Sequence, residues 1–154
     1  MNVILGYKMI RSIRNEDNYF SLLKDDPVRA TIPNERRIGA NKEVLVLLKD
    51  QDPVDVLAVV CVSLQNNIPK TENELFETTT DPTVAIFYTI WSYAPGSAGS
   101  LIFNAVDFIK EKYNSVSRFV TLSPKTEMAK KFHIKNGACV LSDNESSVNY
   151  EYKV

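Results

Sequence analysis

The chain has 154 residues, of which 44% are hydrophobic, and its formal net charge is −1 at pH 7. This length fits a single domain with a sizeable core, so we expect one ordered globule over residues 1–154. A net charge near zero gives no electrostatic support for binding nucleic acid or an anionic membrane. The apolar runs have the length of strands, so the sequence predicts no membrane-spanning segment.

The first half of the chain predicts a strand, a helix and an antiparallel hairpin. Residues 7–13 have the composition of a strand, and residues 15–26 that of a helix with Asn15 as its cap. Two leucine-rich or β-branched runs, "EVLVLLKD" and "VDVLAVVCVSL", flank the turn composition "DQDP" and indicate a hairpin. Residues 67–78 follow as a loop or short helix.

The longest strand candidate is "DPTVAIFYTIWSYA", which is apolar on both faces and therefore typical of a central strand. A helix over about 98–113 follows, because apolar residues recur on one of its faces. Those residues are Leu101, Ile102, Ala105, Val106, Ile109 and Tyr113.

The last third of the chain adds a strand at 117–122, a short helix at 125–136 and strands at 138–143 and 147–154. The order of elements predicts an α+β fold with a mixed central sheet flanked by helices. A right-handed crossover through the long helix makes the strands before and after it parallel. We expect these two strands to splay apart at their C-terminal ends.

The loop "PGSAGS" at the start of the long helix is the first functional signal. A helix N-terminus exposes unpaired backbone N–H groups, and small residues let an anion such as a pyrophosphate approach them. No Gly-Lys-Ser/Thr and no full Gly-x-Gly-x-x-Gly is present, which excludes a nucleoside-triphosphate loop and a dinucleotide fingerprint. Small residues that merely permit the turn remain the alternative explanation.

His133 is the only histidine, and it follows Ser123 across the short helix. Without further information, a histidine near a helix end is more often a surface or capping residue, and a serine before Pro124 a turn residue. The two cysteines, Cys61 and Cys139, lie in apolar runs and predict reduced core thiols in a cytoplasmic protein. One histidine and two scattered cysteines offer no metal site.

Several short motifs together resemble known acyl-CoA proteins. Residues 93–98, Tyr-Ala-Pro-Gly-Ser-Ala, are similar to the Arg/Gln-x-x-Gly-x-Gly/Ala loop of the GNAT acyltransferases, with Tyr93 in place of the basic or amide residue. The segments "AIFYTIWSYAPGSAGSLIFNAVDFIKEKY", "FVTLSP", "FHIKNGA" and "VNYEY" occur in the same order as in the catalytic domain of malonyl-CoA decarboxylases. This resemblance covers residues 36–152, but that family has a long helical insertion where this chain has only "KTEMAKKF".

The resemblance implies a GNAT fold, a coenzyme A site and catalysis by Ser123 and His133, which we expect to face one pocket. Tyr150 or Tyr152 adds a hydroxyl donor, depending on strand register. Coenzyme A is expected to contact Ile90, Trp91, Gly96, Ser97, Ala98, Gly99, Ser100 and Leu101.

Three functions remain open at this point. They are decarboxylation of malonyl-CoA or a related short acyl-CoA, acyl transfer to an amine, and acyl-CoA binding without catalysis. The partner in each case is a small-molecule acyl-CoA, with no nucleic acid and no membrane, and a homodimer is left open.

Overall fold

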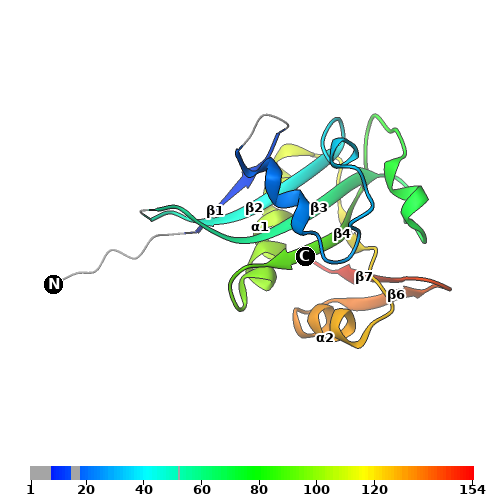
Figure 1. The fold of residues 1–154 in the computed structure, drawn as a ribbon. Coiled ribbons are helices and arrows are strands. Elements are labelled where there is room, and N and C mark those ends of the chain that lie inside the picture. Colours follow the sequence, from blue (N-terminus) through cyan, green and yellow to red (C-terminus); the bar gives the residue numbers. More distant parts are fainter. Residues whose placement is uncertain (1–7, 15–17, 52) are drawn as a thin grey trace.

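The computed structural model describes residues 8–14, 18–51 and 53–154. Its elements are, in chain order, β1 (Lys8–Ser12), the 3₁₀ helices η1 (Asn18–Asp25) and η2 (Asn34–Arg36), β2 (Lys42–Lys49), β3 (Asp55–Gln65), the 3₁₀ helix η3 (Glu72–Phe76), β4 (Val84–Ser92), α1 (Ser97–Lys112), β5 (Arg118–Thr121), α2 (Glu127–Lys135), β6 (Cys139–Asp143) and β7 (Val148–Tyr152). The described strands form one sheet in the order β1-β2-β3-β4-β5-β7-β6 (Figure 1). The predicted α+β class is confirmed.

The sheet is mixed, as expected. Among the described strands, β4 and β5 are parallel neighbours, whereas every other neighbouring pair is antiparallel. A parallel pair needs a long crossover connection, and α1 supplies it between β4 and β5. The predicted hairpin is confirmed as β2 and β3, and β6 and β7 form a second hairpin at the other end of the sheet.

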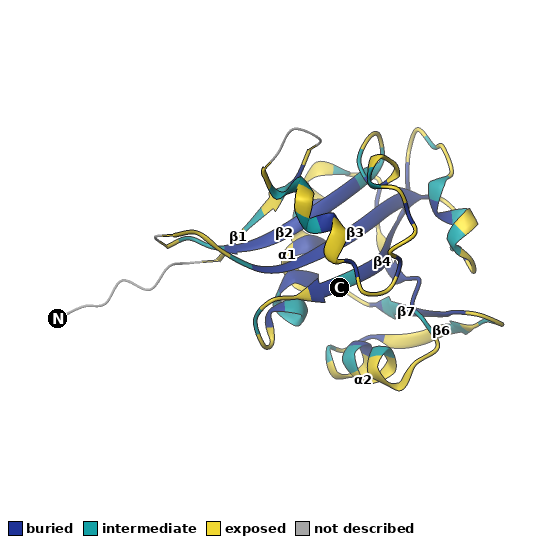
Figure 2. Cartoon of the chain, in the orientation of Figure 1, coloured by how far each residue is buried: buried dark blue, intermediate teal, exposed yellow. Residues whose placement is uncertain are grey.

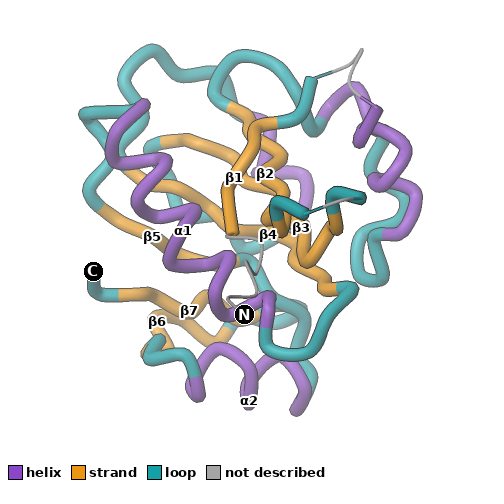
Figure 3. Tube along the Cα trace, turned by 90° about the vertical axis from the view of Figure 1, so that its left-hand side faces the viewer, coloured by secondary structure: helices purple, strands orange, loops and turns teal. Residues whose placement is uncertain are grey.

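Both faces of the sheet are covered, which explains why β4 is apolar on both sides. One face packs on α1, whose buried residues include five of the six expected at helical spacing. Tyr113 is the exception, because it is only half-buried and donates its hydroxyl to Glu43 at 2.8 Å. The opposite face is covered by the segment that includes η1, with Leu23 and Ile32 buried against the strands (Figures 2 and 3).

β4 and β5 pair over only part of their length. Residues 84–87 of β4 lie beside residues 118–121 of β5. The N–H of Leu122 then donates to the carbonyl of Phe87 at 3.0 Å. β4 continues to Ser92 without β5 at its side, so the predicted splay is present.

A β-bulge in β4 gives a physical reason for this splay. The pairing with β3 passes from Thr89 opposite Cys61 to Phe87 opposite Val62, so Tyr88 is an extra residue. A bulge bends its strand and increases the local twist. The bulge falls where the pairing with β5 ends.

α2 begins with a side-chain cap, because Thr126 Oγ1 accepts the N–H of Ala129 at 3.2 Å. It ends in the expected turn, where Gly137 has a φ of 96°. The turn lies against the start of α1, since a Cβ on Gly99 would come within 2.5 Å of Asn136 Oδ1. Gly99 therefore permits the close approach of the two helix ends.

Two predictions differ from the structure. The segment after β1 forms the 3₁₀ helix η1 rather than an α-helix, and the proposed cap Asn15 lies outside the described residues. Cys139 is exposed, whereas Cys61 is buried as expected. The reason is that β6 is an edge strand whose apolar residues are largely uncovered, so an apolar run there does not indicate the core.

Candidate functional site

A pocket of about 340 Å³ lies where β4 and β5 separate. Its walls are residues 87–92 of β4, residues 122–124 after β5, and one side of α2 with the Thr126 that caps it. Pro27 and Val28 close it on the side of η1, and Ala98 lies at its edge from the first turn of α1. The opening between the strands is therefore a cavity rather than a gap filled by side chains.

Ser123 and His133 both line this pocket, as we expected from the sequence. His133 Nε2 lies 3.2 Å from Ser123 Oγ. Both side chains are almost fully buried, with exposed fractions of 5% for His133 and 3% for Ser123. The contact joins the end of α2 to the segment after β5. Each of the two side chains therefore helps to fix the position of the other in the pocket wall.

Two tyrosines of β7 hold the imidazole of His133. Tyr152 Oη lies 2.7 Å from His133 Nδ1, and the ring of Tyr150 stacks on the imidazole with ring centroids 5.0 Å apart. We expected the strand register to decide which tyrosine adds a hydroxyl donor, with Tyr150 as the candidate catalytic residue, whereas the hydroxyl at His133 is that of Tyr152 and Tyr150 contributes its ring. Residues two apart on a strand share a face, so both reach the histidine.

A chain of hydroxyl groups continues from His133 into the sheet. Ser123 Oγ lies 2.7 Å from Thr121 Oγ1, which also accepts the backbone N–H of Tyr150 at 3.0 Å. The sequence analysis missed Thr121, although a threonine two residues before a serine on a strand shares its face. The connected groups are Tyr152, His133, Ser123 and Thr121.

The imidazole of His133 is neutral near pH 7. Burial lowers the pKa of His133 from 6.5 to about 4, because the protonated ring loses its hydration in the core. Burial likewise raises the pKa of Tyr152 above its ordinary value of 10.0. A neutral ring has one N–H donor and one acceptor nitrogen, so His133 can donate one hydrogen bond and accept another at this site.

The start of α1 faces the same region. Gly96 precedes the helix with a φ of 75° and a ψ of −6°, a left-handed conformation that glycine adopts without strain. In an α-helix the N–H groups of Ser100 and Leu101 point at carbonyls one turn back. The N–H groups of Ala98 and Gly99 have no such carbonyl and are free to bind an anion.

Two of the residues expected to contact a cofactor have side chains that point elsewhere. The hydroxyl of Ser97 lies 2.7 Å from the carbonyl of Leu57 and 2.6 Å from that of Ala94, so it holds the loop to β3. Leu101 is fully buried in the core on α1. The side chains of these two residues are therefore not available to a ligand.

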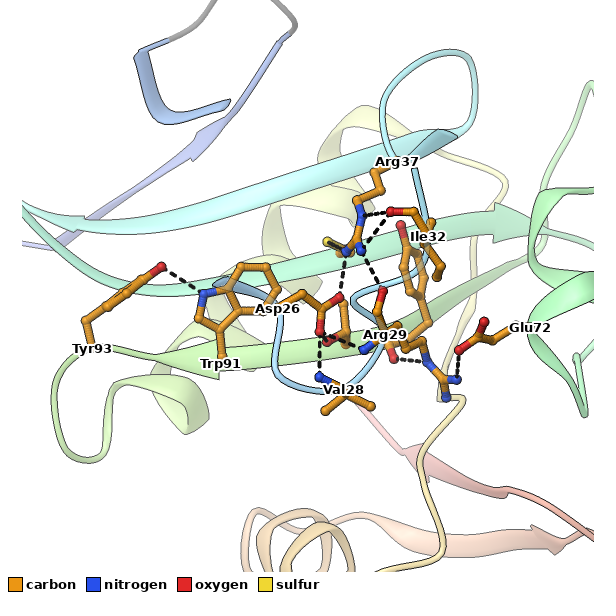
Figure 4. Close-up of polar contacts among 11 residues, drawn as sticks. Asp26, Val28, Arg29, Ile32, Arg37, Glu72, Trp91 and Tyr93 are labelled. Carbon is orange, nitrogen blue, oxygen red and sulfur yellow. Dashed lines mark hydrogen bonds and ion pairs between the residues drawn. The ribbon is translucent and has the colours of Figure 1, made fainter. Parts of the chain in front are cut away.

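Ile90 and Trp91 line the pocket from β4. Trp91 Nε1 donates to Tyr93 Oη at 2.9 Å (Figure 4). That hydroxyl donates to Asp25 Oδ2 at 2.7 Å. Burial and the hydrogen bond to Asp25 raise the pKa of Tyr93 to about 12. Tyr93 thus ties the loop before α1 to η1, and it stays protonated at neutral pH.

Two further findings concern the described part of the chain. Within it, no group of three histidine, cysteine, aspartate or glutamate side chains could hold a metal ion. No helix among those same residues is long and apolar enough to cross a bilayer.

Comparison with known proteins gives matches at the level of structure. No protein-family model and no curated protein sequence matches the chain. Malonyl-CoA decarboxylase from Agrobacterium vitis matches with a TM-score of 0.66 and 20% identity, over 81% of this chain and 35% of that chain. The enzyme of the same name from Cupriavidus metallidurans matches with a TM-score of 0.70 and 14% identity, over 94% of this chain and 60% of that chain.

Acetyltransferase domains match over nearly their whole length. The GNAT domain of S. lividans PAT has a TM-score of 0.65 and 13% identity, and the match covers 99% of this chain and 95% of that chain. The N-acetyltransferase PseH of Campylobacter jejuni has a TM-score of 0.63 and 11% identity, with 95% and 97% covered.

These comparisons define the fold. The chain has the GNAT fold that acyltransferase domains and malonyl-CoA decarboxylases share. It spans between 35% and 60% of the length of the decarboxylase chains that it matches.

Proposed function

We propose that the chain binds an acyl-CoA between β4 and β5 and decarboxylates malonyl-CoA or a related short acyl-CoA. The observation that carries this proposal is the 3.2 Å contact between Ser123 Oγ and His133 Nε2 in the wall of the pocket. The resemblance of the sequence to malonyl-CoA decarboxylases implies a role for the same two residues. The similarity in fold to decarboxylase and acetyltransferase structures supports the acyl-CoA part of the proposal.

The cofactor lies across the start of α1 and along β4. Its pyrophosphate binds the free N–H groups of Ala98 and Gly99, where the helix dipole favours an anion. Its pantetheine arm enters the splay beside Ile90 and Trp91, which line the pocket. This arrangement brings the thioester toward Ser123 and His133 at the inner end.

The reaction breaks the bond between the α-carbon and the carboxylate. Its electron pair moves into the thioester, which becomes an enolate as carbon dioxide leaves. The α-carbon then takes one proton from the N–H of His133, the hydroxyl of Tyr152 returns a proton to the ring at Nδ1, and solvent water restores the tyrosine. Ser123 and the N–H of neutral His133 are donors for the developing oxyanion, a role that is typically worth about a hundred- to a thousand-fold. The hydroxyl of Tyr152, at 2.7 Å from His133 Nδ1, is a proton source for the ring.

The chemical character of the pocket favours decarboxylation. Among the described residues, none that lines the pocket is an aspartate, glutamate, lysine or arginine. A malonyl carboxylate is therefore bound by neutral donors only and gains little stabilisation before the reaction. The pocket thus binds the departing carboxylate weakly before the reaction and stabilises the oxyanion that forms in the transition state. This difference lowers the barrier to decarboxylation.

Acyl transfer to an amine is the second candidate function. The observation in its favour is the neutral imidazole of His133, which can take a proton from an attacking amine. An acyltransferase often has a carboxylate base on the hairpin strands, whereas β3 has the buried Cys61 facing Thr89 of β4. We therefore place this function second.

Mass spectrometry separates the candidates in one experiment. Acetyl-CoA, malonyl-CoA and methylmalonyl-CoA are each incubated with the protein, with and without a mixture of amines. A decarboxylase shortens the acyl group of malonyl-CoA without any amine, whereas an acyltransferase releases free CoA only when an amine is present. Binding without turnover in any mixture points to a non-catalytic acyl-CoA module and contradicts the proposal.

A further inference from the structure

The side chain of Arg29 joins β4 and β5 at the point where they separate. Its Nε donates to the carbonyl of Tyr88 at 2.8 Å, and its Nη2 donates to the carbonyl of Leu122 at 2.7 Å. These carbonyls lie one residue beyond the last paired residues, Phe87 and Thr121. One guanidinium thus supplies the donors that a neighbouring strand would otherwise give to both carbonyls.

Arg29 is itself held by a buried ion pair between Asp26 and Arg37 (Figure 4). Asp26 Oδ1 accepts the backbone N–H of Arg29 at 2.9 Å, and the carbonyl of Arg29 accepts Arg37 Nη2 at 2.7 Å. Arg37 Nη1 lies 2.6 Å from Asp26 Oδ2, and both side chains are at most 1% exposed. The hydroxyl of Thr89 donates to Asp26 Oδ1 at 2.8 Å, which attaches the network to β4.

Asp26 stays ionised in this setting. Burial opposes its charge, but hydrogen bonds from the backbone of Arg29 and the guanidinium of Arg37 outweigh that effect and lower the pKa of Asp26. The third arm of Arg29 is less buried, because Nη1 donates at 2.8 Å to Glu72, whose side chain is 39% exposed. The network therefore holds the backbone of Arg29 and its Nε and Nη2 atoms in the core, whereas Nη1 lies at the surface.

Arg29 acts on the pocket through its neighbours. It does not line the pocket, whereas Pro27 and Val28 before it do. Leu122, whose carbonyl it binds, directly precedes Ser123. The N–H of Ser123 donates to Val148 on β7 at 2.9 Å, so the peptide between Leu122 and Ser123 is held on both sides.

We propose that Arg29 is a positioning residue that sets the separation of β4 and β5 and, through Leu122, the place of Ser123 relative to a thioester held on β4. The part that concerns Ser123 and the thioester rests on the proposed function, whereas the part that concerns strand separation does not. Arginine suits this role because its planar fork holds two acceptors at a fixed distance. A lysine in its place has a single ammonium group and does not reproduce that fixed spacing.

The experiment compares Arg29→Lys and Arg29→Gln with wild type, and uses Glu72→Gln as the matched control. Glu72→Gln weakens only the surface arm of Arg29, so it keeps both contacts with the strand carbonyls. Turnover per CoA-binding site is measured, with the sites counted by calorimetric titration of CoA so that unfolded protein does not affect the result. In the same samples, nuclear magnetic resonance follows the hydrogen-exchange rate of the Leu122 amide, which donates to the carbonyl of Phe87 at the point where β4 and β5 separate.

We expect Arg29→Lys to lower turnover per site by about ten- to a hundred-fold, since a misplacement of about 1 Å at a reacting centre has effects of that size. CoA affinity is expected to fall less than turnover does, because the pyrophosphate binds the N–H groups at the start of α1 and only the pantetheine arm lies in the opening that Arg29 spans. The Leu122 amide is expected to exchange faster in the variant than in Glu72→Gln. Arg29→Gln, with one side-chain amide in place of the fork, is expected to behave in the same way.

The proposal is overturned if the variants that fold lose only thermal stability and keep both the turnover per site and the Leu122 exchange of the control. A wild-type protein that neither binds CoA nor turns over an acyl-CoA contradicts the proposed function instead. In that case the Leu122 amide decides the remaining part of the proposal. Faster exchange in the Arg29 variants supports the fixed strand separation, and unchanged exchange contradicts it.

Discussion

His133 Nε2 reaches within 3.2 Å of Ser123 Oγ although the two residues are ten positions apart in the sequence. A tight turn followed by a short helix explains the contact. The chain turns between Ser123 and Thr126, since the N–H of Thr126 donates to the carbonyl of Pro124 at 2.9 Å. From Thr126 to His133 the helix α2 returns over about 10 Å at 1.5 Å per residue. A short connection therefore brings these two residue types together in this chain, without the long insertion of the decarboxylase family.

Replacing His133 tests the proposed chemistry most directly. We expect His133→Ala to lower turnover of malonyl-CoA by at least about a hundred-fold, because the ring acts mainly in the transition state. CoA affinity is expected to stay nearly unchanged. Steady-state kinetics and calorimetry measure the two effects, with His133→Gln as a variant that preserves more of the packing.

Lys131→Ala, on the exposed side of the same helix, is the control for this substitution. It is expected to leave both turnover and affinity as they are. If His133→Gln turns over malonyl-CoA as fast as Lys131→Ala does, the decarboxylase proposal is wrong.

The two tyrosines at His133 are expected to differ in effect. Tyr152→Phe removes the hydroxyl that pairs with His133 Nδ1 and leaves a buried nitrogen unpaired, which costs about 1–3 kcal/mol of unfolding free energy. Tyr150→Phe keeps the ring that stacks on the imidazole. We therefore expect a larger loss of stability and of turnover for Tyr152→Phe, measured by urea unfolding and by kinetics. Equal losses in both variants would mean that the Nδ1 contact has no special role.

Local pattern was enough to predict the sheet and its main helix. β4 was recognised because it is apolar on both faces, and α1 because its apolar residues recur at helical spacing. The parallel pairing of β4 and β5 followed from the handedness of the crossover. The contact between Ser123 and His133 could also be predicted, since the length of α2 limits where its C-terminal end can lie.

Contacts between distant segments could not be predicted from the sequence. Arg29 lies 59 positions from Tyr88 and 93 positions from Leu122, and nothing local marks it as different from a surface arginine. The bulge at Tyr88 has no glycine or proline to signal it. Cys139 was misassigned because an apolar run on an edge strand has the same composition as one in the core.

The start of α1 gives a test of coenzyme A binding that does not depend on catalysis. We expect Gly96→Asp to weaken CoA binding by about ten-fold or more, because a carboxylate beside the free N–H groups repels the pyrophosphate. Gly39→Asp is the matched control, since Gly39 also has a positive φ and open space around it but lies far from α1 in the sequence. Calorimetry measures both affinities, and equal affinities would contradict the assignment of the loop.

The buried His133 makes a prediction for stability as a function of pH. The pKa of His133 is about 4 in the folded chain and its ordinary value is 6.5, so the unfolded chain takes up the proton first as the pH falls. Stability from this residue is complete above about pH 6.5 and decreases toward pH 4, and the loss between pH 7.5 and pH 5 is about 2 kcal/mol. His133→Gln has no such group and is expected to lose less stability over the same interval. Urea unfolding of both proteins at the two pH values measures the difference, in which the carboxylates common to both cancel. If the two proteins lose the same free energy, the imidazole is not held neutral by burial, and the neutral donor and acceptor that we assign to His133 is the wrong protonation state.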